Sequence, residues 1–452
     1  MVDLLVDGGG REPDVLIDFS FSNYRSFRDE QSFSMTRDKR FSEGAFANRS
    51  TIAAVYGPNA SGKSNFLKAL WAMAIMVRTS YSQGGARTNI PRDSFLLSDE
   101  GKTEDSSFFV EFIAEDNQRY RYWFCFNDGV ILHEELSVYK LIGDRTSSHP
   151  TRLFSRSDDG ISFGNAFRGP RSQIKKTIEL RPNALVLSAA AAAGIVCTQP
   201  AFDFFMTGIA YCDAQGYRDE QPHILGEFNR KTSFAKELAL LIRYADFGIV
   251  DVRSAPVSID KTVMNDLKTQ IGERLGADPD KLDRLLAFGQ ASELQFEHAG
   301  AETTVAFDER NESQGTIAAL SFFSLALRQL ARPTVTLIDE IDTSLHPSLV
   351  EEFIALFTDP ATNPHGSQLV FTTHDASLIN VSGSAGRLID PDQVWLVEKN
   401  KDGASELYPV TDLKVRKEEN VGRNYLNGVY GAVPKPEFHS VFARIIGEGG
   451  AE

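Results

Sequence analysis

The sequence is poor in the features that mark secreted and membrane proteins. Its 452 residues include only three cysteines, Cys125, Cys197 and Cys212, whose spacing matches neither a disulfide framework nor a metal site. The longest apolar stretch, residues 184–196, is too short to span a bilayer, and the first residues, MVDL, lack the basic region of a signal peptide. We therefore expect a cytoplasmic protein with no membrane partner.

An excess of positive charge is also missing. The chain carries 47 Lys and Arg residues against 62 Asp and Glu residues, a formal net charge of −15. Non-specific affinity for nucleic acid comes largely from the neutralisation of phosphates by Lys and Arg, so this balance argues against avid binding of that kind. A local basic patch stays open as an alternative; the candidates are Lys39 and Arg40, then Arg168, Arg171, Lys175 and Lys176, and finally Lys414, Arg416 and Lys417.

The clearest motif that the sequence does contain is a phosphate-binding loop. Residues 57–64, GPNASGKS, fit the pattern G-x-x-x-x-G-K-[ST]. The apolar run 52–56 precedes them and the helix-like run 65–70 follows, which is the strand–loop–helix context that the motif requires.

Each residue type in this loop has a chemical reason. Gly57 and Gly62 let backbone N–H groups approach phosphate oxygens at a helix N-terminus. Lys63 lies near the β- and γ-phosphates in such loops, and the Ser64 hydroxyl binds Mg²⁺. We also expect Asn59 and Asn65 to contact the nucleotide. The cofactors expected for such a loop are ATP and Mg²⁺.

Two further strands are predicted to end in polar side chains. The apolar run 335–338 leads into Asp339 and Glu340, and the run 367–371 leads toward His374. Ligands of open α/β sheets bind at the carboxyl ends of the strands. We therefore expect Asp339 to hold Mg²⁺ through water, Glu340 to orient and deprotonate the attacking water, and His374 to contact the γ-phosphate.

Together these motifs resemble the ABC-type ATPase head shared by SMC and double-strand-break-repair proteins. They more closely resemble the stand-alone ATPases of bacterial abortive-infection and restriction-linked loci, relatives of the overcoming-lysogenisation-defect family. The resemblance implies an α/β fold, a P-loop NTPase of the ABC-ATPase head type with an antiparallel β-subdomain and a mostly helical insertion. It also implies a Walker A motif at residues 57–64, a Walker B motif ending at Asp339, a catalytic glutamate at Glu340 and a switch histidine at His374.

The resemblance further makes residues 313–316, SQGT, the signature motif. In the family this motif opens a helix, and its serine and glycine, here Ser313 and Gly315, reach the γ-phosphate held by a second protomer. Two ATP molecules are then sandwiched in a head-to-tail homodimer or a larger homo-oligomer. The sequence departs from the transporter pattern because the second glycine of the signature is absent and His346, followed by Pro347 opening a helix, replaces the D-loop aspartate.

The remaining segments suggest a three-part organisation. Residues 16–35 read as an aromatic-rich hairpin, in which Arg25 is a candidate nucleotide contact or a solvated turn residue, and residues 108–139 read as an antiparallel meander. We expect residues 1–140 and 308–452 to form the two parts of the head. Residues 141–307 are expected to form the insertion, a mixed and partly helical lobe with helical patterns near 234–244 and 261–288. The insertion has no sustained heptads, so a coiled-coil arm is not expected.

Three functions fit this sequence. The leading hypothesis is an ATPase whose nucleotide-driven assembly controls a separately encoded effector in antiphage defence; no nuclease signature follows the head, and residues 390–392, DPD, look like a turn rather than a metal pair. The competing hypothesis is a DNA-maintenance ATPase that clamps nucleic acid on binding ATP. A transporter energy subunit is disfavoured by the insertion and the altered signature. For the tail, residues 416–434, a packed helix closing the head and a partner-docking surface are both open.

Overall fold

The structure is a computed structural model, and it describes residues 15–41, 48–83, 85, 88–142, 145–245, 247–257, 292–343, 345–380, 387–416, 419–434 and 437–449. Contacts between residues divide the chain into two units. The first unit comprises residues 1–213, 329–342 and 350–452, and the second comprises residues 214–328 and 343–349. Each unit has its own hydrophobic core and is described by itself.

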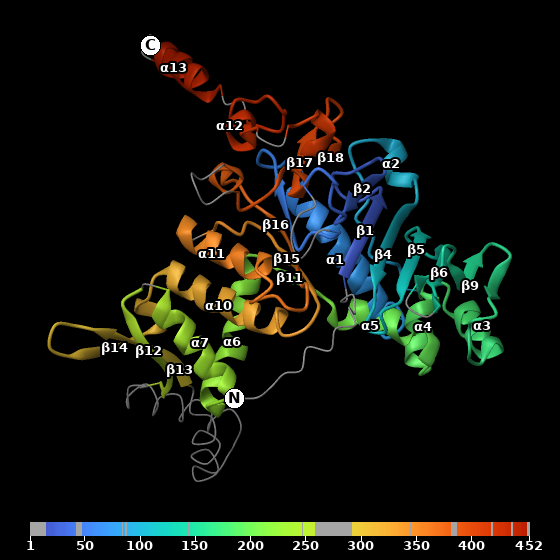
Figure 1. Cartoon of the computed structure of the whole chain (residues 1–452). Coiled ribbons are helices and arrows are strands. Elements are labelled where there is room, and N and C mark those ends of the chain that lie inside the picture. Colours follow the sequence, from blue (N-terminus) through green and yellow to red (C-terminus); the bar gives the residue numbers. More distant parts are fainter. Residues whose placement is uncertain are drawn as a thin grey trace, which may run out of the picture. The chain divides into compact units, whose positions relative to one another are not determined.

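A largely parallel sheet carries the predicted motifs of the first unit (Figure 1). Its strand order is β11-β15-β16-β3-β17-β18, and all neighbours are parallel except the edge strand β18, which is antiparallel to β17. The central strands are continuous apolar or β-branched runs that are buried throughout, as expected for parallel strands. The bounds are β11 Ile209–Cys212, β15 Val335–Ile338, β16 Gln368–Thr372, β3 Ile52–Tyr56, β17 Val394–Lys399 and β18 Ser405–Pro409.

An antiparallel sheet forms the β-subdomain of the same unit. Its order is β10-β9-β6-β5-β4-β1-β2. The side chains of β5 alternate, so that Tyr120, Tyr122, Phe124 and Phe126 enter the core while the residues between them face outward. The predicted hairpin and meander are confirmed, and β9 and β10 extend the sheet. The bounds are β1 Val15–Ser22, β2 Gln31–Ser34, β4 Ser106–Ile113, β5 Arg119–Phe126, β6 Ile131–Tyr139, β9 Thr151–Ser157 and β10 Gly160–Phe163; β7 Leu141–Ile142 and β8 Arg145–Thr146 pair separately.

Helix α1, Lys63–Thr79, packs against both sheets. Phe66, Leu70, Met73 and Val77 recur at helical spacing and are buried, and the Phe66 ring contacts Phe33 of β2 at 5.0 Å between centroids. This core fixes the direction of α1, and with it the position of the phosphate-binding loop at its start. The other helices of the first unit are α2 Asp99–Thr103, α3 Arg171–Leu180, α4 Val186–Ala192, α5 Gln199–Thr207, α12 Val421–Leu426 and α13 Phe438–Gly449.

The second unit combines helices with a small antiparallel sheet. Its core joins apolar residues of α6, α7, β12, β13 and α10. The helix predicted near residues 234–244 is present as α7, whereas the pattern at 261–288 lies outside the described residues. The bounds are α6 Ala214–Arg230, α7 Ser233–Tyr244, β12 Ile249–Pro256, β13 Ser292–Ala299, β14 Thr304–Asp308 and α10 Gln314–Gln329. Helix α11, Pro347–Thr358, begins at the predicted Pro347, and its residues from Val350 onward belong to the first unit.

The units do not follow the boundaries placed at residues 140 and 307. The second unit starts at residue 214 and runs to residue 328. Strands β9 and β10 pair with the β-subdomain, and β11 pairs with β15, so part of the segment expected in the insertion belongs to the two sheets of the head. The pairing of strands from distant segments sets the limits of the two units. A single short strand such as β11 gives little sign of this pairing in the sequence.

Two predictions concern the C-terminal part of the chain, the turn at residues 390–392 and the packing of the tail. Residues 390–392 form a turn before β17, in which the Asp390 and Asp392 carboxylates both accept hydrogen bonds from Arg37, at 2.6 and 2.7 Å, as expected for a structural turn. Tyr425 of α12 is buried against Tyr56 at the end of β3, with 5.4 Å between ring centroids. This part of the tail therefore packs on the head.

Within the described ranges, no helix is both long and apolar enough to cross a bilayer.

A buried carboxylate joins the β-subdomain to α4. Glu134 of β6 is fully buried, and its oxygens accept hydrogen bonds from the Tyr122 hydroxyl at 2.8 Å and from the N–H groups of Val186 and Leu187 at 2.6 and 3.0 Å. Burial raises the pKa of this carboxyl, and the two N–H donors, the nearby Arg156 guanidinium and the Tyr122 hydroxyl oppose that rise.

Replacement of Glu134 with alanine should lower the free energy of unfolding by about 3 kcal/mol, because it leaves three buried donors without an acceptor. Urea unfolding followed by tryptophan fluorescence measures this loss, since all three tryptophans, Trp71, Trp123 and Trp395, belong to the first unit. The matched control is Glu135→Ala next along β6, whose partly exposed carboxylate pairs with a half-exposed Arg152 and accepts from the Ser137 hydroxyl. Equal effects of the two substitutions would contradict this role of Glu134.

Candidate functional site

Three neighbouring strands bring the predicted motifs to one edge of the parallel sheet. Strand β16 pairs with β15 on one side and with β3 on the other, and all three run in the same direction. Their carboxyl ends therefore meet at the same edge. Asp339 follows β15, His374 lies just after β16 and Gly57 follows β3.

The phosphate-binding loop ends in a helix N-terminus that no side chain caps. Helix α1 begins at Lys63, no side chain bonds to its first N–H groups, and its first turn has no acidic residue. Gly62 precedes the helix with a φ of +121°, and a Cβ atom there would lie 2.5 Å from the Ser405 Oγ atom. Only glycine fits this position without strain.

Lys63 is buried within the loop. Its Nζ atom donates hydrogen bonds to the carbonyl oxygens of Gly57 and Pro58 at 2.9 and 3.1 Å. Burial lowers the pKa of this ammonium group, and the carboxylates of Glu340, Asp339 and Asp342 oppose that shift. The carboxylates thus stabilise a positive charge at the mouth of the loop.

Ser64 and Asp339 are brought together although 275 positions separate them in the sequence. The Ser64 hydroxyl donates to Asp339 Oδ1 at 3.0 Å. The same oxygen accepts from the Thr372 hydroxyl at 2.7 Å, which fixes the carboxylate from the end of β16. Sequence reasoning missed Thr372, because nothing in the run 367–371 marks its partner on another strand.

Glu340 adopts a conformation that non-glycine residues rarely occupy. Its φ is +57°, in the left-handed region, and its N–H group donates to the Thr372 Oγ1 atom at 2.7 Å. Its side chain is exposed at the edge of the sheet, one residue beyond the buried Asp339. Such strain persists where the surrounding structure imposes it, often at sites of function. The turn aims the two successive carboxylates in different directions.

His374 lies between the two other strand ends, where Asp342 fixes its backbone. The His374 N–H group donates to Asp342 Oδ2 at 3.2 Å. Burial and the positive charge of Lys63 lower the pKa of the imidazole, against the pull of the carboxylates of Asp342, Glu340 and Asp339. The ring is therefore neutral at pH 7. Asp342 was not singled out from the sequence, where it follows the acidic pair without a motif of its own.

The lowered pKa of His374 predicts a pH dependence. If the neutral ring acts on the γ-phosphate, His374 should cause little change in kcat/KM for ATP hydrolysis between pH 8 and 6.5, because in the free protein its protonation occurs below the ordinary imidazole value of 6.5. A pH profile of kcat/KM, which reports the free protein, measures this, with His374→Gln as the control. An acid loss between pH 8 and 7 that disappears in His374→Gln would contradict it.

The residues at this edge fit a Mg²⁺-bound nucleoside triphosphate. The buried Ser61 Oγ and Asp342 Oδ1 atoms have no hydrogen-bond partner within the described structure, and the N-terminus of α1 offers N–H groups to an anion. A serine hydroxyl and a carboxylate are the oxygen ligands that Mg²⁺ takes together with substrate phosphates. No cluster of three or more His, Cys, Asp or Glu side chains that could hold a metal occurs among the described residues, so such an ion would depend on Ser64, Asp339 and the phosphates.

The predicted signature residues belong to the second unit. Helix α10 begins at Gln314, so the expectation that the motif opens a helix is confirmed. The Ser313 hydroxyl accepts a hydrogen bond from the Thr316 N–H group at 3.0 Å and thus caps the helix. Ser313 is exposed and Gly315 is half-buried. His346 also caps a helix, since its Nδ1 atom accepts from the Ser348 N–H group at 3.2 Å.

Three further candidates lie around the loop in the first unit. Asn59 is exposed, whereas the Asn65 amide donates to the Ser26 hydroxyl at 2.8 Å. Arg25 has a φ of +52° and donates to one carboxylate oxygen of Asp93 from Nε and Nη2, at 2.9 and 2.7 Å. It is therefore an ion-paired turn residue, and it lines a pocket beside α1.

A model of a known protein family matches much of the chain. A family model described as "AAA domain, putative AbiEii toxin, Type IV TA system" matches residues 52–185 and 221–380. These ranges contain every predicted site residue except Arg25. A search of curated proteins finds no match.

Two solved structures of the recombination mediator protein RecF in the RecFOR pathway are similar to the chain. The one with ATPrS is 13% identical, covers 88% of this chain and 99% of its own, and has a TM-score of 0.36. The one with ATP is 12% identical, covers 89% and 99%, and has a TM-score of 0.35. At such scores the likeness carries no argument.

Proposed function

Since the chain belongs to the family described as an AAA domain, putative AbiEii toxin of a type IV toxin–antitoxin system, we propose that it binds and hydrolyses Mg-ATP. The observation that carries this proposal is the contact between Ser64 at the start of α1 and Asp339 at the end of β15. This contact lies beside an uncapped helix N-terminus, with Glu340 one residue further, and supports the proposal that the pair binds magnesium.

Each residue then has a defined task. The N–H groups at the start of α1 and the Lys63 ammonium bind the phosphates, and Ser64 and Asp339 hold the metal. Bound Mg²⁺ supplies charge neutralisation at the phosphates. Glu340 orients the attacking water and accepts its proton, while the neutral His374 ring donates a hydrogen bond to the γ-phosphate.

Phosphate release from ATP by the purified chain tests this proposal. Turnover should require Mg²⁺ and stop on addition of EDTA. It should fall strongly in Asp339→Asn but little in Asp359→Asn, a control in the turn after α11. Turnover that continues in EDTA or in Asp339→Asn would overturn the metal assignment.

The proposal extends to ATP-driven self-association through Ser313 and Gly315. Ser313, just before α10, is exposed, Gly315 in its first turn is half-buried, and the N-terminus of the helix can receive an anion. Two copies arranged head to tail would each place this helix on the γ-phosphate of the other. Hydrolysis would then release the pair, so nucleotide state would set the assembly.

We further propose that the chain controls a separately encoded effector in antiphage defence. Helix α13 offers a contact surface for such a partner: Phe438, Phe442, Ile445 and Ile446 are each more than half exposed and share one face of the helix. Co-purification with the effector should be lost in Phe442→Asp/Ile446→Asp and kept in Ser440→Asp. An unchanged complex would exclude this surface.

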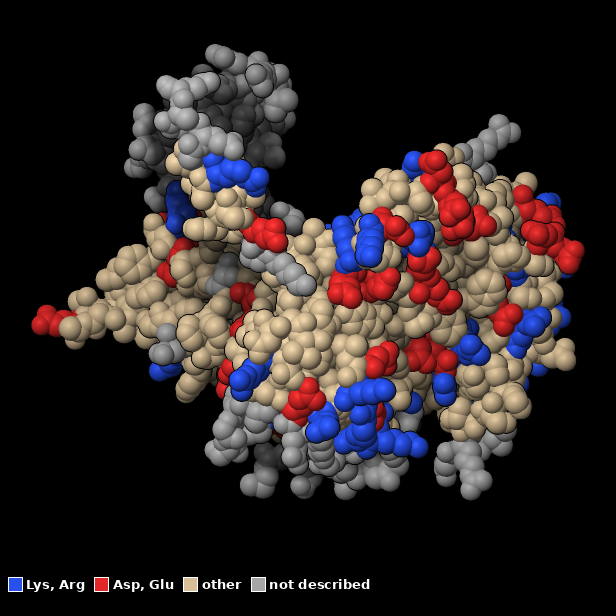
Figure 2. Space-filling view, turned by 90° about the horizontal axis from the view of Figure 1, so that it is seen from above, with Lys and Arg blue, Asp and Glu red and all other residues tan. Residues whose placement is uncertain are grey.

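One observation favours the alternative of a nucleic-acid clamp. Lys231, Lys236, Arg243 and Arg253 line a groove of about 470 Å³ beside α7 and β12 in the second unit. On the face that Figure 2 shows, basic and acidic side chains are interspersed. Duplex DNA binding that weakens steeply with salt, and that Lys236→Glu/Arg243→Glu abolishes, would support this function. Affinity equal in the variant would reject the groove.

A further inference from the structure

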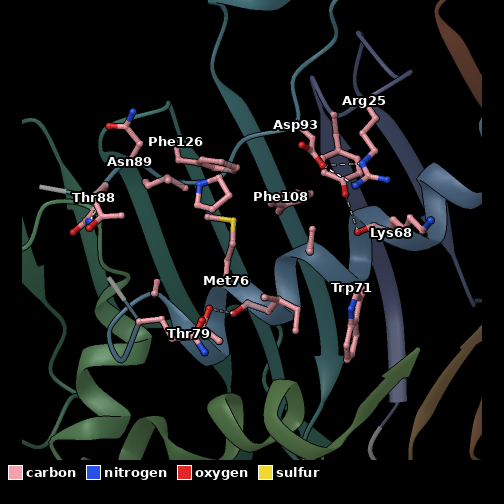
Figure 3. A pocket seen from close by; sticks show the side chains of 18 of the residues that line it. Arg25, Lys68, Trp71, Met76, Thr79, Thr88, Asn89, Asp93, Phe108 and Phe126 are labelled. Atoms are coloured by element: carbon pink, nitrogen blue, oxygen red, sulfur yellow. Dashed lines mark hydrogen bonds and ion pairs between the residues drawn. The ribbon is translucent and has the colours of Figure 1, made fainter. Parts of the chain in front are cut away.

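A pocket of about 590 Å³ lies beside α1 in the first unit. Figure 3 shows its two ends: Arg25, Asp93 and Lys68 lie at one, and Thr88 and Asn89 at the other, with Met76 and Phe126 in between. We call the region around Arg25, Asp93 and Lys68 the near end, and the region lined by Met76, Asn89, Ile90, Phe126 and Asn183 the far end. The volume lies within the range of small-molecule sites in proteins.

The far end lies beyond the reach of a nucleotide bound at the phosphate-binding loop. Lys68 follows Ser64 by one turn of α1, whereas Met76 follows it by twelve residues, or about 18 Å along the helix axis. A ribose and base attached to phosphates at the helix start are together shorter than that distance. The near end can therefore receive the nucleoside of ATP, and the far end needs an occupant of its own.

The chemistry of the far end suits a flat, uncharged ring system. Its lining includes apolar side chains and the amides of Asn89 and Asn183, but no charged residue. Aromatic rings and a methionine contact planar heterocycles well. Asparagine amides match the donor and acceptor edge of a nucleobase.

An unsatisfied acceptor adds a specific demand. The Asn183 Nδ2 group donates to the carbonyl oxygens of Gly85 and Thr88 at 3.0 and 2.8 Å. Its Oδ1 atom is buried and has no hydrogen-bond partner within the described structure. A buried acceptor without a donor costs about 1–3 kcal/mol, so a ligand N–H group at this wall would be stabilising.

The wall that carries Asn183 is held rigidly. The Arg156 guanidinium donates to the carbonyl oxygens of Pro182 and Ala184 at 2.7 and 2.9 Å, on either side of Asn183. Glu134 accepts from the N–H groups of Val186 and Leu187 just beyond. A fixed wall loses little conformational entropy when a ligand binds.

We propose that the far end of this pocket binds a nucleobase or nucleoside, at a second site separate from the ATP bound at the phosphate-binding loop. The ring lies between Met76 and Phe126, and one of its N–H groups donates to Asn183 Oδ1 once that buried atom has turned toward the ligand. Since α1 forms the floor of this site and carries Lys63 and Ser64 at its start, an occupant there contacts the same helix that binds the phosphates.

Titration calorimetry with adenosine, guanosine, cytidine and uridine, one at a time, tests the proposal. The titrations use the full chain saturated with a non-hydrolysable ATP analogue and Mg²⁺, so that the near end is already filled. At least one nucleoside should bind with a stoichiometry of one per chain. Absence of binding by all four, or binding that the ATP analogue abolishes, would overturn a second site.

Two variants locate the site. Met76→Trp fills the space between the walls, and Asn183→Leu removes the acceptor; each should weaken nucleoside binding at least tenfold while leaving affinity for the ATP analogue within twofold. Lys102→Met on α2, which does not line the pocket, is the control and should change neither affinity. Asn183→Leu also removes the hydrogen bonds to Gly85 and Thr88. If this loss unfolds the Asn183→Leu protein, the result for Met76→Trp decides. Nucleoside binding unchanged in Met76→Trp would place it elsewhere.

Discussion

The Lys63→Ala protein should lose measurable ATP binding, with affinity reduced at least about 100-fold, or about 2.7 kcal/mol. The Nζ atom of Lys63 is held by the carbonyl oxygens of Gly57 and Pro58 at the mouth of the loop, facing the site where the phosphates are proposed to lie. Alanine removes the positive charge that nearby carboxylates maintain there.

Equilibrium binding of a fluorescent ATP analogue measures this loss. Lys102→Ala is the control, because it removes an exposed lysine of α2 that lines neither the loop nor the pocket, and it should leave affinity within a few-fold. Comparable thermal unfolding of the two variants would show that the effect is local. Near-normal affinity in Lys63→Ala would mean that the loop is not the nucleotide site.

The Glu340→Gln protein should bind ATP normally and hydrolyse it about 10² to 10⁴ times more slowly. The amide keeps the shape of the carboxylate and can still orient water, but it cannot accept the proton. Asp339, Ser64 and Thr372, which form the contacts proposed to hold the metal, are untouched by this change.

Single-turnover hydrolysis separates chemistry from product release in this variant. Glu352→Gln on α11 serves as the control, since its side chain is exposed, whereas Val350, Phe353 and Phe357 form the buried face of that helix. Turnover within a few-fold of wild type in Glu340→Gln would remove Glu340 from the reaction and leave its left-handed backbone without a catalytic explanation.

Local patterns predicted much of the fold. The loop at 57–64 was predicted together with its strand and helix, and β3 and α1 occupy those positions. Alternating aromatics predicted the antiparallel meander, and the apolar runs predicted β15 and β16 to within one or two residues. In each case a motif of adjacent residues carries the physical constraint.

Contacts between distant segments explain what the sequence did not reveal. Thr372 orders both Asp339 and Glu340, and Asp342 fixes His374, yet each depends on the strand order β15-β16-β3, which no local pattern specifies. The same holds for β9, β10 and β11, whose pairing assigns them to the head. Arg25 was a nucleotide-contact candidate, and its partner Asp93, 68 positions away, could not be inferred from the sequence.

ATP binding is proposed to join two copies of the chain. The mass of the Glu340→Gln protein in solution, with and without Mg-ATP, tests it most directly, because this variant should hold ATP without consuming it. We expect Mg-ATP to raise the mass in solution from that of the 50.0 kDa chain to twice that value. A further Ser313→Arg substitution at the proposed contact should cancel this rise. A single chain under both conditions, or an oligomer of constant size, would contradict ATP-driven pairing.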